Sequence, residues 1–176
     1  HGEENVKVHR DEPVFDGQFS NRCYREAVKQ AFTHFSEKAI SQNIFDPEMD
    51  VILTEQWARI IMHLPYAFQA KRMFPDVFRH DRQHLDSWKH VEAEIGAMPE
   101  EADFESTDEW EKAMDGYRSA ISKTESFKQF VEDRIEKGQR ASSLIGNQYT
   151  GSIFLALMAT FEADYEENAN LDNVTF

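Results

Sequence analysis

The amino-acid sequence predicts a predominantly helical region with one or a few β-strands, and three observations support this expectation. Apolar residues recur at spacings of three and four along most of the chain, as they do in helices that bury one face. A short apolar run at residues 58–62 ends close to a proline and is typical of a buried strand. The chain has 176 residues, 40% of them hydrophobic, which is enough for one domain with a core.

The first predicted helix follows Ser20, an N-cap residue type that comes just after a turn at residues 16–17. Its apolar positions are Tyr24, Ala27, Val28, Ala31, Phe32, Phe35 and Ala39. Cys23, the single cysteine, lies on this helix beside Tyr24 and is expected to be a buried, unreactive thiol. One cysteine forms no intramolecular disulfide, which favours a reducing, cytoplasmic setting.

Residues 58–62 are predicted to form the strand, and Pro65 favours extended geometry for Leu64. His63 would then stand at the carboxyl end of the strand, where open α/β sheets bind their ligands. Because one strand cannot pair its own backbone groups, we expect its partner strands to lie outside these 176 residues.

Helices are predicted to fill the rest of the chain. Their expected ranges are residues 67–74, Pro75 to about Gly96, a helix from Thr107, a helix from Thr124 that stops at Gly138, and a final apolar helix containing Ile153 and Tyr165. A polar loop bracketed by glycines, residues 146–152, leads into the last helix. Its free N–H groups suit a carbonyl oxygen, an oxyanion or a phosphate. Residues 1–12 and 166–176 are polar ends.

The net charge limits the classes of partner. Nineteen Lys and Arg residues stand against 33 Asp and Glu residues, so the net charge is -14. Binding to nucleic acid and to anionic membrane surfaces both need clustered cations, so neither is expected. The sequence contains no apolar stretch long enough for a signal peptide or a membrane span.

His63 and Asn147 are the candidate catalytic residues. A histidine at a strand end can act as an acid, a base or a hydrogen-bond donor near neutral pH, although a histidine satisfied by a backbone carbonyl fits the same pattern. The Asn147 amide can donate to a developing oxyanion, and simple turn formation is the competing interpretation. Lys71, Arg72 and Arg140 are the places where this acidic chain can hold a phosphate-bearing ligand.

His80 and His84 lie four residues apart on one predicted helical face, which resembles half of a metal site. The residues between them lack the glutamate of the metalloprotease motif, and a solvated histidine face explains the pattern as well. We therefore expect no metal.

Three blocks of sequence resemble the 3-hydroxy-3-methylglutaryl-CoA synthase family in order and approximate spacing. They are PVFDGQFSNRCY at residues 13–24, IMHLPY at 61–66 and GQRASSLIGNQYTGS at 138–152. The resemblance extends to the mevalonate-pathway enzymes of isoprenoid biosynthesis and to relatives that install β-branches on polyketides. It implies a thiolase-like α/β fold, of which residues 1–176 would be a partial C-terminal half.

The resemblance also implies an acyltransferase reaction in which acetyl-CoA, acetoacetyl-CoA and water yield 3-hydroxy-3-methylglutaryl-CoA and CoA. The nucleophilic cysteine and general-base glutamate of that family lie upstream of the first block, so Cys23 is not the nucleophile. This chain alone is therefore expected to be inactive. The CoA thioesters are substrates, no separate cofactor is implied, and the full-length enzyme is expected to be a homodimer.

Carried over residue by residue, the resemblance gives five positions a role. His63 matches the histidine that binds and polarises the acetoacetyl thioester, and Asn147 matches the asparagine that hydrogen-bonds the acyl group. Arg72 matches a basic position that contacts the CoA phosphates, and Lys71 is its neighbour. Tyr149 belongs to a recurring block and is expected to bind substrate.

Two alternatives stay open. Phe68 occupies a position where mevalonate-pathway enzymes usually carry another CoA-contacting lysine. This departure favours the polyketide-branching relatives, which act on acyl groups held by an acyl carrier protein. The other alternative is a helical interaction module without catalysis, whose acidic face binds a basic partner.

Overall fold

The computed structural model describes residues 16–44 and 51–170 of the chain. These two ranges contain α1 (Gly17–Ser41), α2 (Gln69–Met73), α3 (Pro75–Arg82), α4 (Trp88–Ile95), α5 (Thr107–Ile121), α6 (Glu125–Arg134), α7 (Glu136–Ile145) and α8 (Ser152–Glu166), with short 3-10 helices at Leu53–Glu55, Glu101–Asp103 and Tyr149–Gly151. The described part of the chain is therefore helical and contains no β-strand. None of its helices is long and apolar enough to cross a bilayer.

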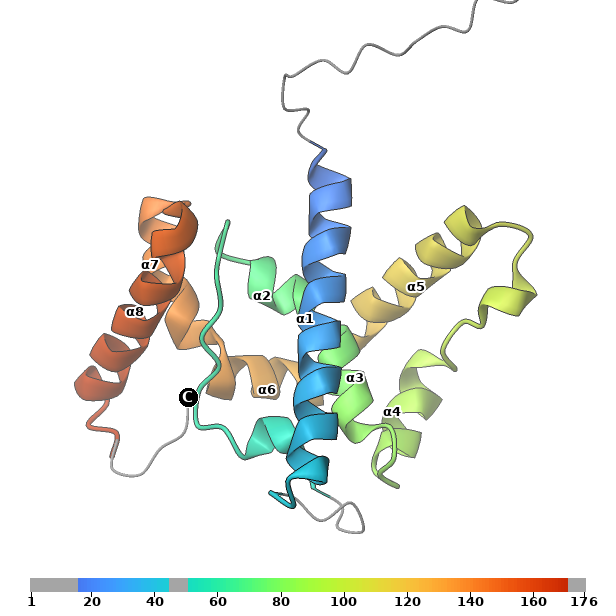
Figure 1. Cartoon of the computed structure of the whole chain (residues 1–176), viewed down its shortest axis with the longest axis horizontal. Coiled ribbons are helices and arrows are strands. Elements are labelled where there is room, and N and C mark those ends of the chain that lie inside the picture. Colours follow the sequence, from blue (N-terminus) through green and yellow to red (C-terminus); the bar gives the residue numbers. More distant parts are fainter. Residues whose placement is uncertain (1–15, 45–50, 171–176) are drawn as a thin grey trace, which may run out of the picture.

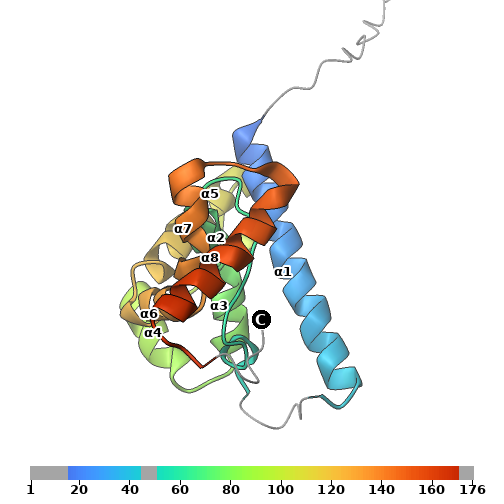
Figure 2. The same cartoon turned by 90° about the vertical axis from the view of Figure 1, so that its left-hand side faces the viewer.

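The helices form a broad, asymmetric arrangement (Figure 1). α7 and α8 lie side by side at one end, α4 and α5 lie at the other, and α2, α3 and α6 lie between them. Figure 2 shows that α1 runs along one side of the other helices. A non-helical stretch, residues 57–65 (the 57–65 segment), passes between α1 and the α7–α8 pair.

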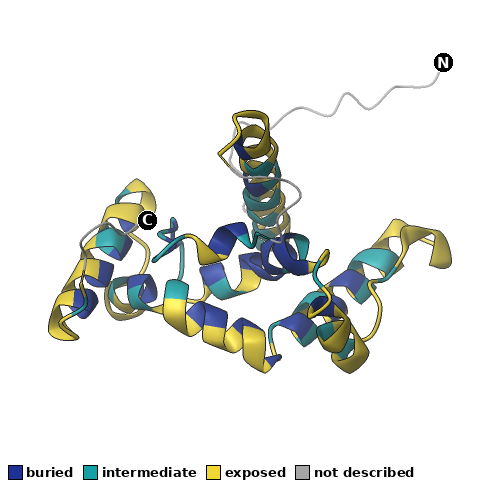
Figure 3. Cartoon of the chain, turned by 90° about the horizontal axis from the view of Figure 1, so that it is seen from below, coloured by how far each residue is buried: buried dark blue, intermediate teal, exposed yellow. Residues whose placement is uncertain are grey.

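The core is centred on α3. The Phe78 ring lies in its middle, with its centroid 5.3 Å from that of Phe130. The Arg82 guanidinium covers the Phe78 ring at 4.1 Å, and Asp81 accepts hydrogen bonds from two backbone N–H groups at residues 53–54. Both charged side chains are buried with partners, which is the condition under which a core tolerates them. Figure 3 shows buried positions gathered in the middle of the molecule, between its two ends.

The strand predicted for residues 58–62 is wrong, because the segment has no ladder partner within the described residues. The Ile60 N–H donates instead to the Arg134 carbonyl oxygen at 2.8 Å. The Leu64 N–H donates to the Ser152 Oγ at 3.1 Å. The end of α6 and the start of α8 thus supply acceptors that a sheet would otherwise supply.

Several helix boundaries also differ from the predictions. α1 begins before Ser20 because Asp16 caps it, accepting hydrogen bonds from two backbone N–H groups at 3.0 Å. The single helix predicted from Pro75 to about Gly96 is divided into α3 and α4. Gly138 does not stop a helix but lies inside α7.

Gly138 permits α7 to pack closely on α8. A Cβ atom at this position would lie 3.3 Å from Thr160 Oγ1 and 3.5 Å from the Ala156 carbonyl oxygen. Glycine is needed here because two helices approach closely. The sequence rule that glycine ends a helix does not reveal this role.

Cys23 is exposed, so its predicted burial is wrong. Tyr24, Val28 and Phe32 are the α1 residues that pack on the core. Consecutive helical residues point about 100° apart, and Cys23 is consequently turned away from the core despite its neighbour.

Candidate functional site

His63 lies where the 57–65 segment meets α1 and the N-terminus of α8. The Tyr24 hydroxyl of α1 donates to the His63 carbonyl oxygen at 2.7 Å, and the Tyr24 ring meets the imidazole edge-on with centroids 6.3 Å apart. Burial raises the pKa of the Tyr24 hydroxyl, so this group remains a donor. Ser152, the first residue of α8, places its Oγ 2.5 Å from His63 Nδ1.

Ser152 fixes the orientation of the imidazole. Its side chain is fully buried, and its Oγ accepts a hydrogen bond from the Leu64 N–H at 3.1 Å. Among the described residues, the acceptor that faces the Ser152 hydroxyl proton is His63 Nδ1. When the Ser152 hydroxyl donates to Nδ1, the imidazole carries its hydrogen on Nε2. His63 then presents an Nε2–H donor.

Asn147 and Tyr149 lie on the exposed loop between α7 and α8. Asn147 Oδ1 accepts a hydrogen bond from the Tyr149 N–H at 2.7 Å, which is the local turn chemistry of asparagine. The Asn147 amide nitrogen has no hydrogen-bond partner in the described part of the chain and is free to donate. Because Ser152 ends this loop, the structure brings the loop to His63, although His63 and Asn147 share no hydrogen bond.

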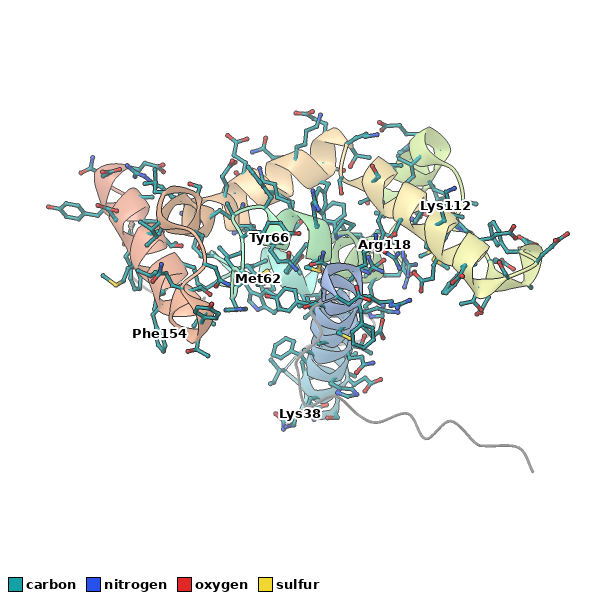
Figure 4. All side chains as sticks on the ribbon, turned by 90° about the horizontal axis from the view of Figure 1, so that it is seen from above. Lys38, Met62, Tyr66, Lys112, Arg118 and Phe154 are labelled. Carbon is teal, nitrogen blue, oxygen red and sulfur yellow. The ribbon has the colours of Figure 1, made fainter. Side chains whose placement is uncertain are left out.

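The predicted phosphate-binding cations have different surroundings. Lys71 forms an ion pair with Glu136 of α7 at 3.3 Å, and Arg140 pairs with a glutamate of α8 at 2.8 Å. Arg72 has no carboxylate partner within the described residues, and its guanidinium lies 5.7 Å from the centroid of the Tyr66 ring. Figure 4 labels Tyr66, which lies close to the end of α1 in that view. Of these cations, Arg72 is the one left available.

Arg72 lines a pocket of about 880 Å³ between α1, the junction of α2 with α3, and α5. α1 contributes Arg22 and Arg25, and α5 contributes Lys112 and Arg118. His63 does not line this pocket. Tyr24, which contacts His63, lies on the same turn of α1 as Arg22, but the two side chains point about 200° apart around the helix.

His80 lies against an aromatic ring of α1. Its ring meets the Phe32 ring edge-on with centroids 5.9 Å apart. Burial and the charge of Arg79 lower the pKa of His80, so its neutral form is favoured. Within the described residues, no group of three or more His, Cys, Asp or Glu side chains is placed to hold a metal ion.

Sequence reasoning missed Ser152 and Tyr24 as the residues that support His63. Both lie inside the recurring blocks, at the end of residues 138–152 and of residues 13–24. Their place in those blocks was the available signal, but a serine at a helix start and a tyrosine on an apolar face have ordinary structural interpretations.

Comparisons with known proteins agree on one family. A family model described as "Hydroxymethylglutaryl-coenzyme A synthase C terminal" matches residues 7–175. The hydroxymethylglutaryl-CoA synthase of Haloferax volcanii is 27% identical over 166 residues, which are 94% of this chain and 35% of that relative. The chain thus spans about a third of the length of the curated relative that it matches. No solved structure gives a significant match.

Proposed function

Because the chain belongs to the hydroxymethylglutaryl-CoA synthase C-terminal family, we propose that it forms part of an enzyme that makes 3-hydroxy-3-methylglutaryl-CoA. The enzyme condenses acetyl-CoA with acetoacetyl-CoA, consumes water and releases CoA. The hydrogen bond between Ser152 Oγ and His63 Nδ1 is the observation that carries the proposal. It joins two recurring blocks at one place, and a Ser152 hydroxyl that donates to Nδ1 leaves an Nε2–H to polarise the acyl group.

The reaction uses donors of this chain together with groups from outside it. An acetyl group is held as a thioester on a cysteine supplied by the rest of the enzyme, and a base removes a proton from its methyl group. The carbanion attacks the β-carbonyl carbon of acetoacetyl-CoA, the carbonyl oxygen takes a proton, and water hydrolyses the thioester to the cysteine. His63 Nε2–H and the Asn147 amide polarise the acetoacetyl group and offset its developing charge.

The remaining predicted residues hold the substrate. Arg72 contacts the CoA phosphates, and Lys71 on the same helix adds positive potential despite its ion pair with Glu136. Tyr149 lies in the Asn147 loop with 78% of its surface exposed, where it contacts the acyl portion.

An exposed apolar face supports the proposal that residues 1–176 are completed by further polypeptide in a thiolase-like α/β fold. α8 exposes Phe154, Met158 and Tyr165, and Leu144 at the end of α7 is 79% exposed. Phe154 projects from the outer side of α8 in Figure 4. Such a patch usually marks an interface. We place the complete enzyme in the cytoplasm as a homodimer that needs no separate cofactor.

The second candidate is a β-branching synthase that takes its acceptor from an acyl carrier protein. Phe68 favours this second candidate. It is 62% exposed and occupies the position where mevalonate-pathway enzymes carry a lysine that contacts CoA. A non-catalytic interaction module is disfavoured by the exposed apolar face of α8, which a free-standing domain would bury.

The test uses the full-length protein that contains these residues. Release of CoA is measured with acetyl-CoA and either free acetoacetyl-CoA or acetoacetyl groups on a carrier protein. We expect turnover with free acetoacetyl-CoA, and a loss of about a hundredfold or more in kcat for His63→Ala. His84→Ala, at an exposed histidine of the α3–α4 connection, is the matched control. Turnover with the carrier-bound acceptor alone would select the second candidate, and no turnover with either would contradict both.

A further inference from the structure

A buried carboxylate of α8 holds the start of the 57–65 segment. Arg59 Nε lies 3.1 Å from Asp164 Oδ2, and Arg59 Nη2 lies 2.5 Å from Asp164 Oδ1. The Asp164 side chain is fully buried, with 0% exposure. Arg59 Nη1 also donates to the Asp133 carbonyl oxygen of α6 at 3.2 Å. Because the guanidinium binds the carboxylate through two N–H groups, both the position and the orientation of the Arg59 side chain are fixed.

The other end of the segment is attached to the start of the same helix. Ser152 Oγ accepts a hydrogen bond from the Leu64 N–H at 3.1 Å and lies 2.5 Å from His63 Nδ1. Ser152 is the first residue of α8, whereas the carboxylate that binds Arg59 lies near the last turn of that helix. The segment is therefore attached near both ends of α8 and runs in the opposite direction to it.

The lengths of the helix and of the segment match. Ser152 and Asp164 are 12 positions apart on α8, which corresponds to about 18 Å of helix. Their partners Arg59 and Leu64 are five positions apart, and five extended residues span roughly 17 Å. The backbone between these partners contains no helical turn and no bend. The segment is therefore extended and has little slack, so that a shift at one attachment moves the other end as well.

A second cation binds the same carboxylate from a different element. Lys137 Nζ of α7 lies 2.6 Å from Asp164 Oδ1 and 2.6 Å from a Glu167 oxygen. α7 also packs directly on α8 at Gly138, so the pairing of these two helices has further support. Arg59, in contrast, forms the one ion pair that attaches the 57–65 segment to a helix within the described residues. The two cations of Asp164 therefore have separable roles.

The energetics of a buried ion pair favour a role in selecting one arrangement of the chain. Burial opposes the charge of the Asp164 carboxylate, and hydrogen bonds from Arg59 and Lys137 offset this cost and lower its pKa. Buried ion pairs often add little net stability, because desolvation cancels much of the attraction, and their best-attested role is to fix a register. The register fixed here is that of the 57–65 segment along α8.

We propose that Arg59 and Asp164 are positioning residues of the reaction, because their contact sets the register of the 57–65 segment on α8 and so places the His63 imidazole beside Ser152. The inference rests on the proposed function, which gives His63 an acyl group to polarise. Neither Arg59 nor Asp164 belongs to the three sequence blocks that carry the family resemblance. Both act on the reaction through His63, without contact with substrate.

The experiment compares two variants of the full-length enzyme that each remove one cation from Asp164. Arg59→Met detaches the segment, and Lys137→Met is the matched control, because it removes a cation on α7 and leaves the segment attached. Both variants should lower Tm. For Arg59→Met we expect kcat to fall roughly tenfold or more, with the KM for acetyl-CoA nearly unchanged, since a catalytic group displaced by about 1 Å loses much of its effect. For Lys137→Met, kcat should stay within about twofold of the wild-type value.

Nitrogen NMR of labelled histidine gives a second measurement, which needs no turnover. The ring signals of His63 are identified by their loss in His63→Ala. They should shift in Arg59→Met and keep their wild-type positions in Lys137→Met. An enzyme without condensing activity would contradict the proposed function, whereas the His63 signals would still decide whether Arg59 positions the ring.

Equal losses of kcat in Arg59→Met and Lys137→Met would overturn the proposal, since they would indicate a general loss of stability. Unchanged His63 signals in a folded Arg59→Met enzyme would overturn it as well. If Arg59→Met does not fold, Arg59→Lys takes its place, because lysine keeps the charge and lacks the planar pair of donors. We then expect shifted His63 signals and a severalfold lower kcat, and wild-type signals with wild-type kcat would overturn the proposal.

Discussion

Replacing Ser152 by alanine tests the network that orients His63. The change removes the oxygen that accepts from the Leu64 N–H at 3.1 Å and contacts His63 Nδ1 at 2.5 Å, at a side chain with 0% exposure. A buried N–H without a partner costs about 1–3 kcal/mol of stability. The imidazole also loses the one hydrogen bond of its Nδ1 that the described residues supply. If a similar free energy is lost in the transition state, kcat falls roughly tenfold to a hundredfold.

The assay combines kinetics with a direct observation of the ring. The full-length Ser152→Ala enzyme should show the lower kcat, with the KM for acetyl-CoA nearly unchanged, and nitrogen NMR of labelled histidine should detect loss of the single Nε2–H tautomer of His63. Ser143→Ala is the control, because the Ser143 hydroxyl is exposed and donates only to the Arg140 carbonyl oxygen among the described residues. A folded Ser152→Ala enzyme with the wild-type kcat, alongside an inactive His63→Ala, would refute this reasoning.

Two further predictions concern the Tyr24 hydroxyl, which contacts His63, and the buried Asp164 carboxylate, which binds Arg59 of the 57–65 segment and Lys137 of α7. Tyr24→Phe removes the hydroxyl that donates to the His63 carbonyl oxygen at 2.7 Å. We expect thermal unfolding to show that the free energy of unfolding falls by about 1 kcal/mol, and kcat/KM to fall severalfold. An unchanged free energy of unfolding together with an unchanged kcat/KM would contradict the role of this hydroxyl. Asp164→Asn weakens a buried cluster: burial opposes the charge of the Asp164 carboxylate, yet hydrogen bonds from Arg59 and Lys137 lower its pKa. A lowered carboxylate pKa stabilises the fold above about pH 4, and this contribution is lost as pH falls through the lowered pKa. The wild-type Tm should therefore exceed that of Asp164→Asn at neutral pH, and the two should converge in acid. A constant difference across that range would contradict the assignment.

Local sequence rules predicted the helices where capping and periodicity are strong. Pro75 begins α3, and Thr124 caps α6 by accepting a hydrogen bond from the Phe127 N–H at 3.3 Å, both as expected. The short apolar run at residues 58–62 and the following proline predicted His63 at the end of a strand, and the structure places it near the end of a non-helical stretch instead.

What failed depended on contacts between residues far apart in the chain. The apolar run at residues 58–62 is typical of a buried strand, but the acceptors for Ile60 and Leu64 N–H come from the ends of helices, so the predicted element is wrong. Gly138 has the residue type of a helix stop, and its actual role depends on Thr160, 22 positions away. The partnership of Ser152 with His63 spans 89 positions, which no local rule detects.

The central proposal is that His63 and Asn147 act on the same acyl group. A double-mutant cycle on kcat/KM for acetoacetyl-CoA, built from His63→Ala, Asn147→Ala and the double variant of the full-length enzyme, measures this most directly. We expect each single variant to lose much of the activity and the double variant to lose clearly less than the product of the two losses. A double variant whose loss equals that product, or a single variant at either position with wild-type kcat/KM, would contradict the account.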